Sequence, residues 1–331
     1  MIERYQKVID AIAEKARRDC PGSLALIGVY GSCCTGNTHE KSDLDLLILI
    51  NDENGYCLSK TFIAGEIGHD LYCTTWQALE SDAQFRHPHI SKLMDSKILY
   101  CASDEYLSRL EALRKQAAEA DTQDAADATL DNARKAYAKV VTAADLGKAR
   151  YFTVEMLHQL FDAIALLNGR YFRRGVRRVF EELEAMPRHP ENLKETVDEI
   201  LCARDLPQLH TRLAQLLRSV ENLFVSESVV PQPFPGTYEE MFSNWRNKMY
   251  LAAETGDRFL SFDSLCALNG MLMELDYHWN IPNKFDPNDL EANANIFDET
   301  LDRFRKEYEK FGISPAVYPS MEDFIRDYLK L

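Results

Sequence analysis

The feature that most constrains this chain is a short apolar run, residues 44–50, with one acidic residue directly before it and another at its second position. Asp43 and Asp45 stand one residue apart and alternate with leucines. Successive side chains of a strand point to opposite faces, so the carboxylates share one face while the leucines enter the core. Two carboxylates held side by side repel each other unless a cation lies between them. The pattern predicts a sheet that binds a divalent cation, and Mg²⁺ suits such oxygen ligands.

A glycine–serine pair upstream favours a metal site over the alternative, a pair of aspartates facing solvent from an edge strand. Gly31 and Ser32 directly follow the apolar run 24–30 and precede Asp43 by ten intervening residues. Glycine lets backbone N–H groups approach a phosphate closely, and the serine adds a hydroxyl donor. This turn and the aspartates together would hold a nucleoside triphosphate by its phosphates and through its metal.

Hydrophobic periodicity predicts an α+β chain of two domains. Residues 1–121 are expected to form a small mixed β-sheet domain with flanking helices. The expected elements are helices over 2–19, 76–85 and from 104, and strands over 24–30, 44–50, 56–64, 66–76 and 96–102. An Ala- and Asp-rich segment, residues 117–129, marks the boundary. Residues 122–331 are expected to be all-α, in two helical groups split near 226–238, where three prolines interrupt the pattern.

Composition restricts the partners and the compartment. The net charge is −15, and residues 1–121 (13 basic, 19 acidic) and 122–331 (25 basic, 34 acidic) are both acidic. This disfavours a nucleic-acid partner and favours a cationic small molecule. No apolar run could span a bilayer, the N-terminus lacks a secretory signal, and the eight cysteines include no CxxC pair. A cytoplasmic protein without a membrane partner is expected.

The motif resembles a known signature. Tyr30-Gly31-Ser32, ten residues, then Asp43-Leu44-Asp45-Leu46 is similar to the hydrophobic-Gly-Ser and Asp-x-Asp pattern of the DNA polymerase β nucleotidyltransferase superfamily. A small α/β domain followed by helices resembles its kanamycin-, lincosamide- and streptomycin-type antibiotic nucleotidyltransferases. The resemblance implies an enzyme that transfers a nucleoside monophosphate from an NTP, ATP first, to a hydroxyl of a small cationic molecule such as an aminoglycoside-like antibiotic. It also implies antibiotic resistance and a homodimer.

The resemblance further implies a two-metal site. Asp43 and Asp45 would hold one Mg²⁺ and share a second with a third carboxylate on a following strand. Asp70 matches that position, with Glu66 as the alternative. The residues expected to bind the nucleotide phosphates are Gly31, Ser32 and Ser42, together with Lys148 as a candidate that the family pattern does not itself supply.

One helix is expected to supply the general base. Glu155, His158 and Asp162 are spaced i, i+3 and i+7 and therefore share a helix face. The resemblance makes Glu155 the candidate base by position. No lysine stands four residues after it, so the family's accompanying phosphate-binding lysine is not matched, and Lys148 or Arg150 is the candidate substitute. A solvated helix face is the alternative interpretation of these residues.

Two other patterns have simpler interpretations. His87-Pro88-His89 is interpreted as a turn, and the basic run "NGRYFRRGVRR", residues 168–178, as a charged helix surface, with triphosphate or partner binding as the alternative. Two other functions also remain open for the whole chain. One is the protein-modifying nucleotidyltransferase of toxin–antitoxin pairs, and the other is a non-catalytic nucleotide-binding protein on the same fold.

Overall fold

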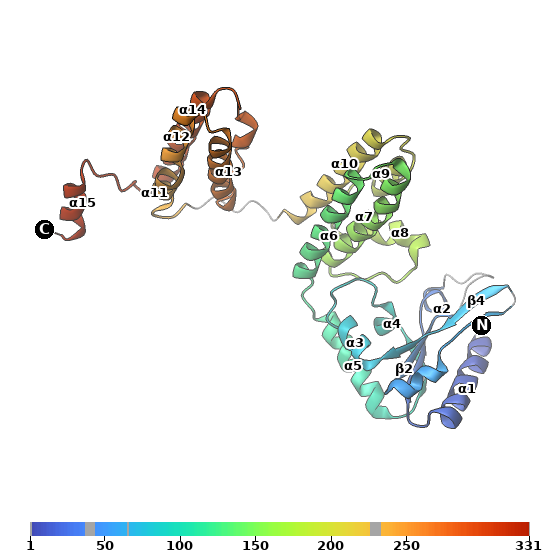
Figure 1. Cartoon of the computed structure of the whole chain (residues 1–331). Helices are drawn as coiled ribbons and strands as arrows, with labels where there is room; N and C mark the ends of the chain where they lie inside the picture. Colours follow the sequence, from blue (N-terminus) through green and yellow to red (C-terminus); the bar gives the residue numbers. More distant parts are fainter. Residues whose placement is uncertain (1, 37–43, 65, 226–232, 331) are drawn as a thin grey trace. The chain divides into compact units, whose positions relative to one another are not determined.

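The computed structural model describes residues 2–36, 44–64, 66–225 and 233–330. The chain divides into two compact units, Met1–Val225 and Ser226–Leu331 (Figure 1). The first unit contains the β-sheet and a helical group. The second is entirely helical in its described part.

The central sheet has four strands in the order β5-β2-β1-β6. β1 runs antiparallel to β2 and to β6, while β2 and β5 are parallel. β3 and β4 form a separate antiparallel hairpin. The strands are β1 (Leu24–Val29), β2 (Leu46–Ile50), β3 (Lys60–Ala64), β4 (Ile67–Leu71), β5 (Cys73–Thr75) and β6 (Lys97–Cys101).

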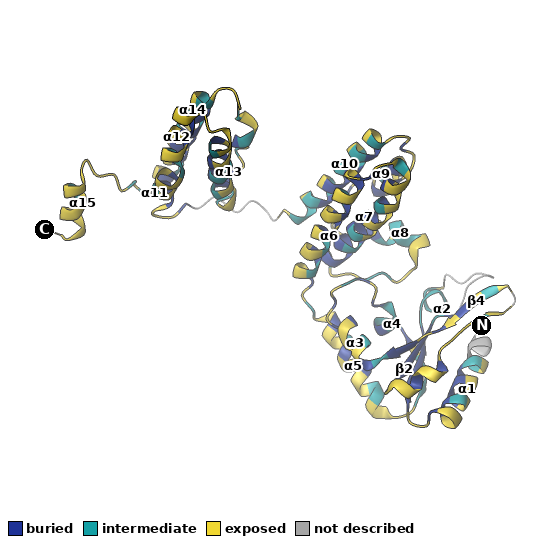
Figure 2. Ribbon diagram, in the orientation of Figure 1, coloured by how far each residue is buried: buried dark blue, intermediate teal, exposed yellow. Residues whose placement is uncertain are grey.

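Helices cover both faces of the sheet, which explains why every residue of β1 and β2 is buried (Figure 2). One face packs Leu46, Ile48 and Ile50 against α1. The opposite face packs Leu47 and Leu49 against α3, α4 and α5. The helices of this domain are α1 (Ile2–Asp19), α2 (Ser32–Thr35), α3 (Trp76–Asp82), α4 (Ser91–Met94) and α5 (Asp104–Ala118), with the 3-10 helix η1 (Glu53–Leu58).

A helical group completes the first unit. It consists of α6 (Gln123–Val141), α7 (Leu146–Leu167), η2 (Val176–Arg178), α8 (Val179–Glu184), α9 (Leu193–Leu201) and α10 (Leu206–Phe224). α6 and α7 pack along each other around an apolar core. The end of α7 enters the core of the sheet domain through Leu166 and Leu167. Thr122 Oγ1 also donates a buried 2.6 Å hydrogen bond to the Leu166 carbonyl, so α7 is held against the sheet domain.

The second unit has its own core around Phe297, Phe304 and Tyr308. Its elements are α11 (Thr237–Met241), η3 (Phe242–Arg246), α12 (Asn247–Thr255), α13 (Arg258–Glu274), η4 (Ile281–Lys284), α14 (Leu290–Lys310) and α15 (Met321–Tyr328). No residue of α15 is fully buried.

The structure confirms the predicted fold class, a small mixed sheet with flanking helices followed by a mostly helical region. Two local predictions were wrong. Residues 56–58, the start of the expected strand 56–64, belong instead to η1, because Asp52 caps that turn by accepting a hydrogen bond from the Asn54 N–H. β2 begins at Leu46, so Asp45 lies just before the strand. Its carbonyl still accepts a 3.2 Å hydrogen bond from the Tyr30 N–H.

Candidate active site

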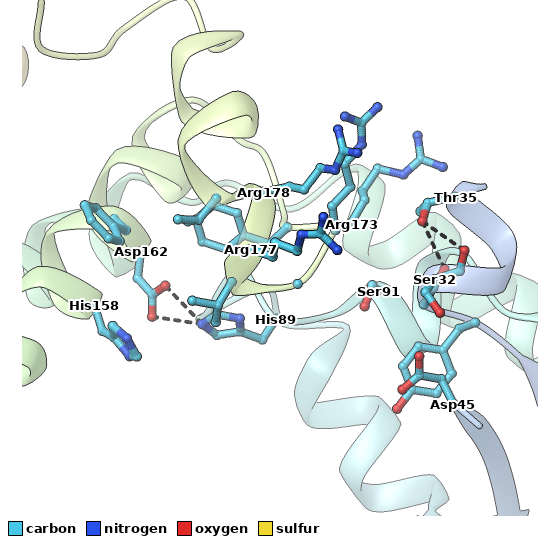
Figure 3. A pocket seen from close by; sticks show the side chains of 18 residues that line it. Ser32, Thr35, Asp45, His89, Ser91, His158, Asp162, Arg173, Arg177 and Arg178 are labelled. Carbon is cyan, nitrogen blue, oxygen red and sulfur yellow. Dashed lines mark hydrogen bonds and ion pairs between the residues drawn. The ribbon is translucent and has the colours of Figure 1, made fainter. Parts of the chain in front are cut away.

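A cavity of about 520 Å³ lies where the sheet domain meets the helical group of the first unit (Figure 3). The end of β1, the α2 turn and Asp45 form one part of its wall. His89 and Ser91 precede and begin α4, and the helical group contributes α7 and the segment from Phe172 to Val179. A cavity of this size is within the usual range for a small-molecule or cofactor site.

The turn after β1 brings Gly31 against Asp45. Gly31 has φ 69°, and the N–H groups of Cys34 and Thr35 both donate to its carbonyl, at 3.0 and 3.2 Å. A Cβ on residue 31 would stand 2.7 Å from Cγ of Asp45, closer than real side chains approach. Glycine is therefore required at residue 31 for two reasons, the positive φ and the lack of space for a Cβ. The predicted phosphate-binding turn and one predicted metal ligand are therefore in direct contact.

A histidine–aspartate pair lies at the α7 side of the cavity. His89 Nε2 is 3.0 Å from Asp162 Oδ1 and 3.2 Å from Oδ2. The hydrogen bond that the His89 ring donates to the Asp162 carboxylate raises the pKa of His89, and partial burial of the ring opposes the shift. The segment 87–89 is a connection between helices, as expected, but it also supplies a side chain to the cavity.

Four arginines also line the cavity: Arg173, Arg174, Arg177 and Arg178. In the view of Figure 3, Arg173, Arg177 and Arg178 lie between the Ser32–Thr35 turn and the His89–Asp162 pair. The sequence interpretation of this run as a charged helix surface was therefore wrong: residues 168–175 lie outside the helices, and only Val176–Arg178 form the short 3-10 helix η2. Its only sequence signal was the density of arginine in an otherwise acidic chain.

The structure brings together some of the predicted site residues. Gly31, Ser32 and Asp45 line the cavity. Asp43 and Ser42 lie outside the described residues. Of the predicted face of α7, His158 and Asp162 line the cavity, and Glu155 does not.

Glu155 and Lys148 lie on α7 away from the cavity lining. The carboxylate of Glu155 forms a 2.6 Å ion pair with Lys139 of α6, and its side chain is 42% exposed. Lys148 is exposed in the first turn of α7, where its backbone N–H bonds to the cap residue Asp145. Arg150 donates to the Ala203 carbonyl at 2.9 Å. The assignment of Glu155 as base and of Lys148 as phosphate ligand stays a prediction.

Asp70, the predicted third carboxylate, is exposed on β4 and accepts a 3.1 Å hydrogen bond from Thr61. Glu66 lies in the turn between β3 and β4, with φ 64°. β2 and β5 pair with an offset of 25 residues, since Ile48 faces Cys73 (73 − 48 = 25). Asp70 precedes β5 and lies in β4, which pairs with β3 in a separate two-stranded sheet, so this pairing does not extend to Asp70. Asp70 does not line the cavity in the described part of the chain and stays a prediction.

The described residues fit a metal site only in part. No cluster of three His, Cys, Asp or Glu side chains suited to a metal occurs within residues 2–36, 44–64, 66–225 and 233–330. Asp45 faces the cavity with a carboxylate, the hard oxygen donor that Mg²⁺ prefers. Its predicted partner Asp43 lies outside the described part.

Comparison with known proteins agrees with this geometry. Residues 9–100 match the family model of the nucleotidyltransferase domain, so the chain is a nucleotidyltransferase enzyme. Residues 106–229 match the model of the KNTase C-terminal domain. The chain thus belongs to the kanamycin nucleotidyltransferase-like members of the DNA polymerase β superfamily, as its sequence predicted.

Other comparisons add less. A crystal structure titled as a nucleotidyltransferase-like protein from Exiguobacterium sibiricum 255-15 is similar at 14% identity and a TM-score of 0.34, over 82% of this chain and 88% of that one. No curated protein matches the chain. None of the described helices is both long and apolar enough to cross a membrane.

Proposed function

We propose that this protein is a Mg²⁺-dependent nucleotidyltransferase that moves a nucleoside monophosphate from an NTP, ATP first, to a hydroxyl of a small molecule. The observation that carries the proposal is the shared cavity. The Gly31–Ser32 turn and Asp45 from the sheet domain line it together with Asp162 from α7. A phosphate-binding turn, a metal-binding carboxylate and a second carboxylate are the groups that such a transfer needs.

The residues have separate roles in this proposal. Asp45, with Asp43 and Asp70, would hold two Mg²⁺ ions, which when bound neutralise charge on the triphosphate and at the attacking oxygen. Gly31 and Ser32 would orient the phosphates for attack at the α-phosphorus. The acceptor oxygen forms a bond to that phosphorus, the bond to the β-phosphate oxygen breaks, and pyrophosphate leaves. Positioning and charge stabilisation account for most of the acceleration.

Two carboxylates of α7 are candidates for the general base that removes the acceptor proton. Glu155 is the base that the sequence resemblance predicts. Asp162 is favoured by the structure, because it lines the cavity and is held by His89 at 3.0 Å. A general base must reach the proton that it removes. We therefore assign the role to Asp162 in this proposal and keep Glu155 as the competing assignment.

The proposed acceptor is small, hydroxylated and cationic, like an aminoglycoside antibiotic. Its amino groups would lie near the carboxylate of Asp162, and the net charge of −15 would attract it from solution. An antibiotic acceptor would make the protein a resistance enzyme. A homodimer and a cytoplasmic location are kept as predictions.

A transfer assay tests the proposal. The protein is incubated with Mg²⁺, each of four α-³²P-labelled NTPs, and a panel of aminoglycosides, lincosamides and unrelated proteins. Label on a small molecule, lost in Asp45→Asn, supports the proposal. Label on a protein supports the toxin–antitoxin alternative. Nucleotide binding without transfer to any acceptor supports a non-catalytic nucleotide-binding protein.

A further inference from the structure

The four arginines of residues 173–178 outnumber the acidic side chains that form ion pairs with them. Arg173 pairs with Asp95 at 3.0 Å, and Arg174 and Arg178 share Glu181, at 3.3 and 2.8 Å. Arg177 has no ion pair among the residues that the structure describes. Four guanidinium groups thus have only two carboxylates, those of Asp95 and Glu181, as ion-pair partners among the described residues. This surplus of positive charge lies in a chain with 38 basic and 53 acidic residues.

The backbone of this segment is held in place. The N–H groups of Arg173 and Arg174 donate to the two oxygens of Glu182, at 2.9 and 3.1 Å. The N–H of Phe172 donates to the Pro88 carbonyl at 2.9 Å, which joins the segment to the connection that carries His89. Glu182 therefore orders the main chain and leaves the guanidinium groups for other partners. A held segment of this kind binds a ligand at a lower entropic cost than a free one.

The chemistry of the wall indicates a phosphate ligand. A guanidinium group is a planar fork of N–H donors that matches phosphate oxygens, and it stays charged at any working pH. The segment shares its cavity with the Gly31–Ser32 turn and Asp45, where the proposed function places a triphosphate.

We propose that residues 173–178 form a phosphate-binding wall, defined by Arg173, Arg174, Arg177 and Arg178, with Arg177 as its main contact. Arg174 and Arg178 exchange Glu181 for phosphate oxygens when the ligand binds. The identity of the ligand rests on the proposed function: the triphosphate of the NTP, or a phosphate carried by the acceptor, supplies the same chemistry.

Calorimetric titration of the full-length protein tests the wall without requiring catalysis. The variants are Arg177→Gln and Arg174→Gln, and the matched control is Arg170→Gln, an exposed arginine of the same basic run that does not line the cavity. Inorganic tripolyphosphate and ATP are expected to bind at least about tenfold more weakly to Arg177→Gln than to wild type. Adenosine binding and the thermal midpoint are expected to change little.

A second titration distinguishes the two phosphate sources. With the site saturated by Mg²⁺ and α,β-methylene-ATP, glucose 6-phosphate is added. If the wall holds the triphosphate, this second anion does not bind there. If it holds an acceptor phosphate, glucose 6-phosphate binds wild type and Arg170→Gln but not Arg177→Gln, while ATP affinity is unaffected.

Equal affinity of folded wild type and Arg177→Gln for tripolyphosphate, ATP and glucose 6-phosphate would overturn the proposal. The outcome is independent of the transfer assay. If the wild-type protein transfers no nucleotide but Arg177→Gln weakens tripolyphosphate binding, the phosphate-binding wall is supported and only the proposed function is contradicted.

Discussion

The carboxylate of Asp45 occupies the space that a side chain on residue 31 would need. The two residues come from opposite ends of the segment between β1 and β2, and Asp45 Cγ is 2.7 Å from the position of a Cβ on Gly31. The positive φ of Gly31 turns the chain at this point. A change at either residue therefore disturbs both the proposed phosphate-binding turn and the proposed metal ligand.

Gly31→Ala is expected to abolish nucleotidyl transfer, because the new methyl group displaces the Asp45 carboxylate. It should also lower the free energy of unfolding by about 1–2 kcal/mol or more, from the strain of a positive φ. Gly36→Ala is the matched control: Gly36 has φ 72°, but a Cβ there meets nothing within 4 Å. Urea denaturation and the transfer assay measure both effects. Equal activity of the two variants would contradict the steric argument.

Asp45→Asn is expected to lower kcat/KM by about a hundredfold or more, since a charge that holds the metal is removed. The Mg²⁺ concentration needed for half-maximal rate should rise. Asp10→Asn, on the exposed face of α1, changes the net charge equally and should leave the rate as in wild type. An unchanged Mg²⁺ dependence in Asp45→Asn would remove Asp45 from the metal site.

Asp162→Asn is expected to lower kcat by about 10²-fold or more, the usual effect of losing a general base. Glu155→Gln, which removes an ion pair with Lys139 outside the cavity, should change kcat little. Single-turnover transfer rates measure both. The opposite ranking of the two variants would establish Glu155, the sequence prediction, as the base.

The His89–Asp162 pair should make stability depend on pH. The pKa of His89 is raised above its ordinary value of 6.5 by Asp162. The pair therefore stabilises the fold below about pH 6.5, and this contribution is lost as pH rises through the raised pKa. The effect should be below about 1 kcal/mol, because the His89 side chain is 61% exposed.

NMR titration of the His89 ring measures the shift directly, and urea denaturation at pH 6 and pH 8 measures its effect on stability. Asp162→Asn should return the pKa of His89 toward its ordinary value and reduce the difference between the two stabilities. A pKa of His89 that is the same in wild type and Asp162→Asn would show that the hydrogen bond does not govern its charge.

Most of the fold was predictable from the sequence, because its signals are local. Buried strands β1 and β2 are continuous apolar runs, and the helices repeat apolar residues with helical spacing. The deviations also have local causes. The capping side chain of Asp52 starts a 3-10 turn that extends to Leu58 and so replaces the first residues of the strand expected over 56–64.

The sequence alone determined the class of enzyme. Gly31-Ser32 and Asp43-x-Asp45 follow and precede two neighbouring strands that are joined by a short segment. Because these residues are close in the sequence, their spacing can be recognised without the structure. Tertiary structure decided the composition of the cavity. His89 and Asp162 are 73 residues apart, and the arginines of residues 173–178 share a cavity with the Gly31 turn because contacts such as those of Leu166 and Leu167 hold α7 against the sheet domain. Packing between segments that are distant in the sequence sets these contacts. No local sequence pattern indicates which face of a helix will line the cavity.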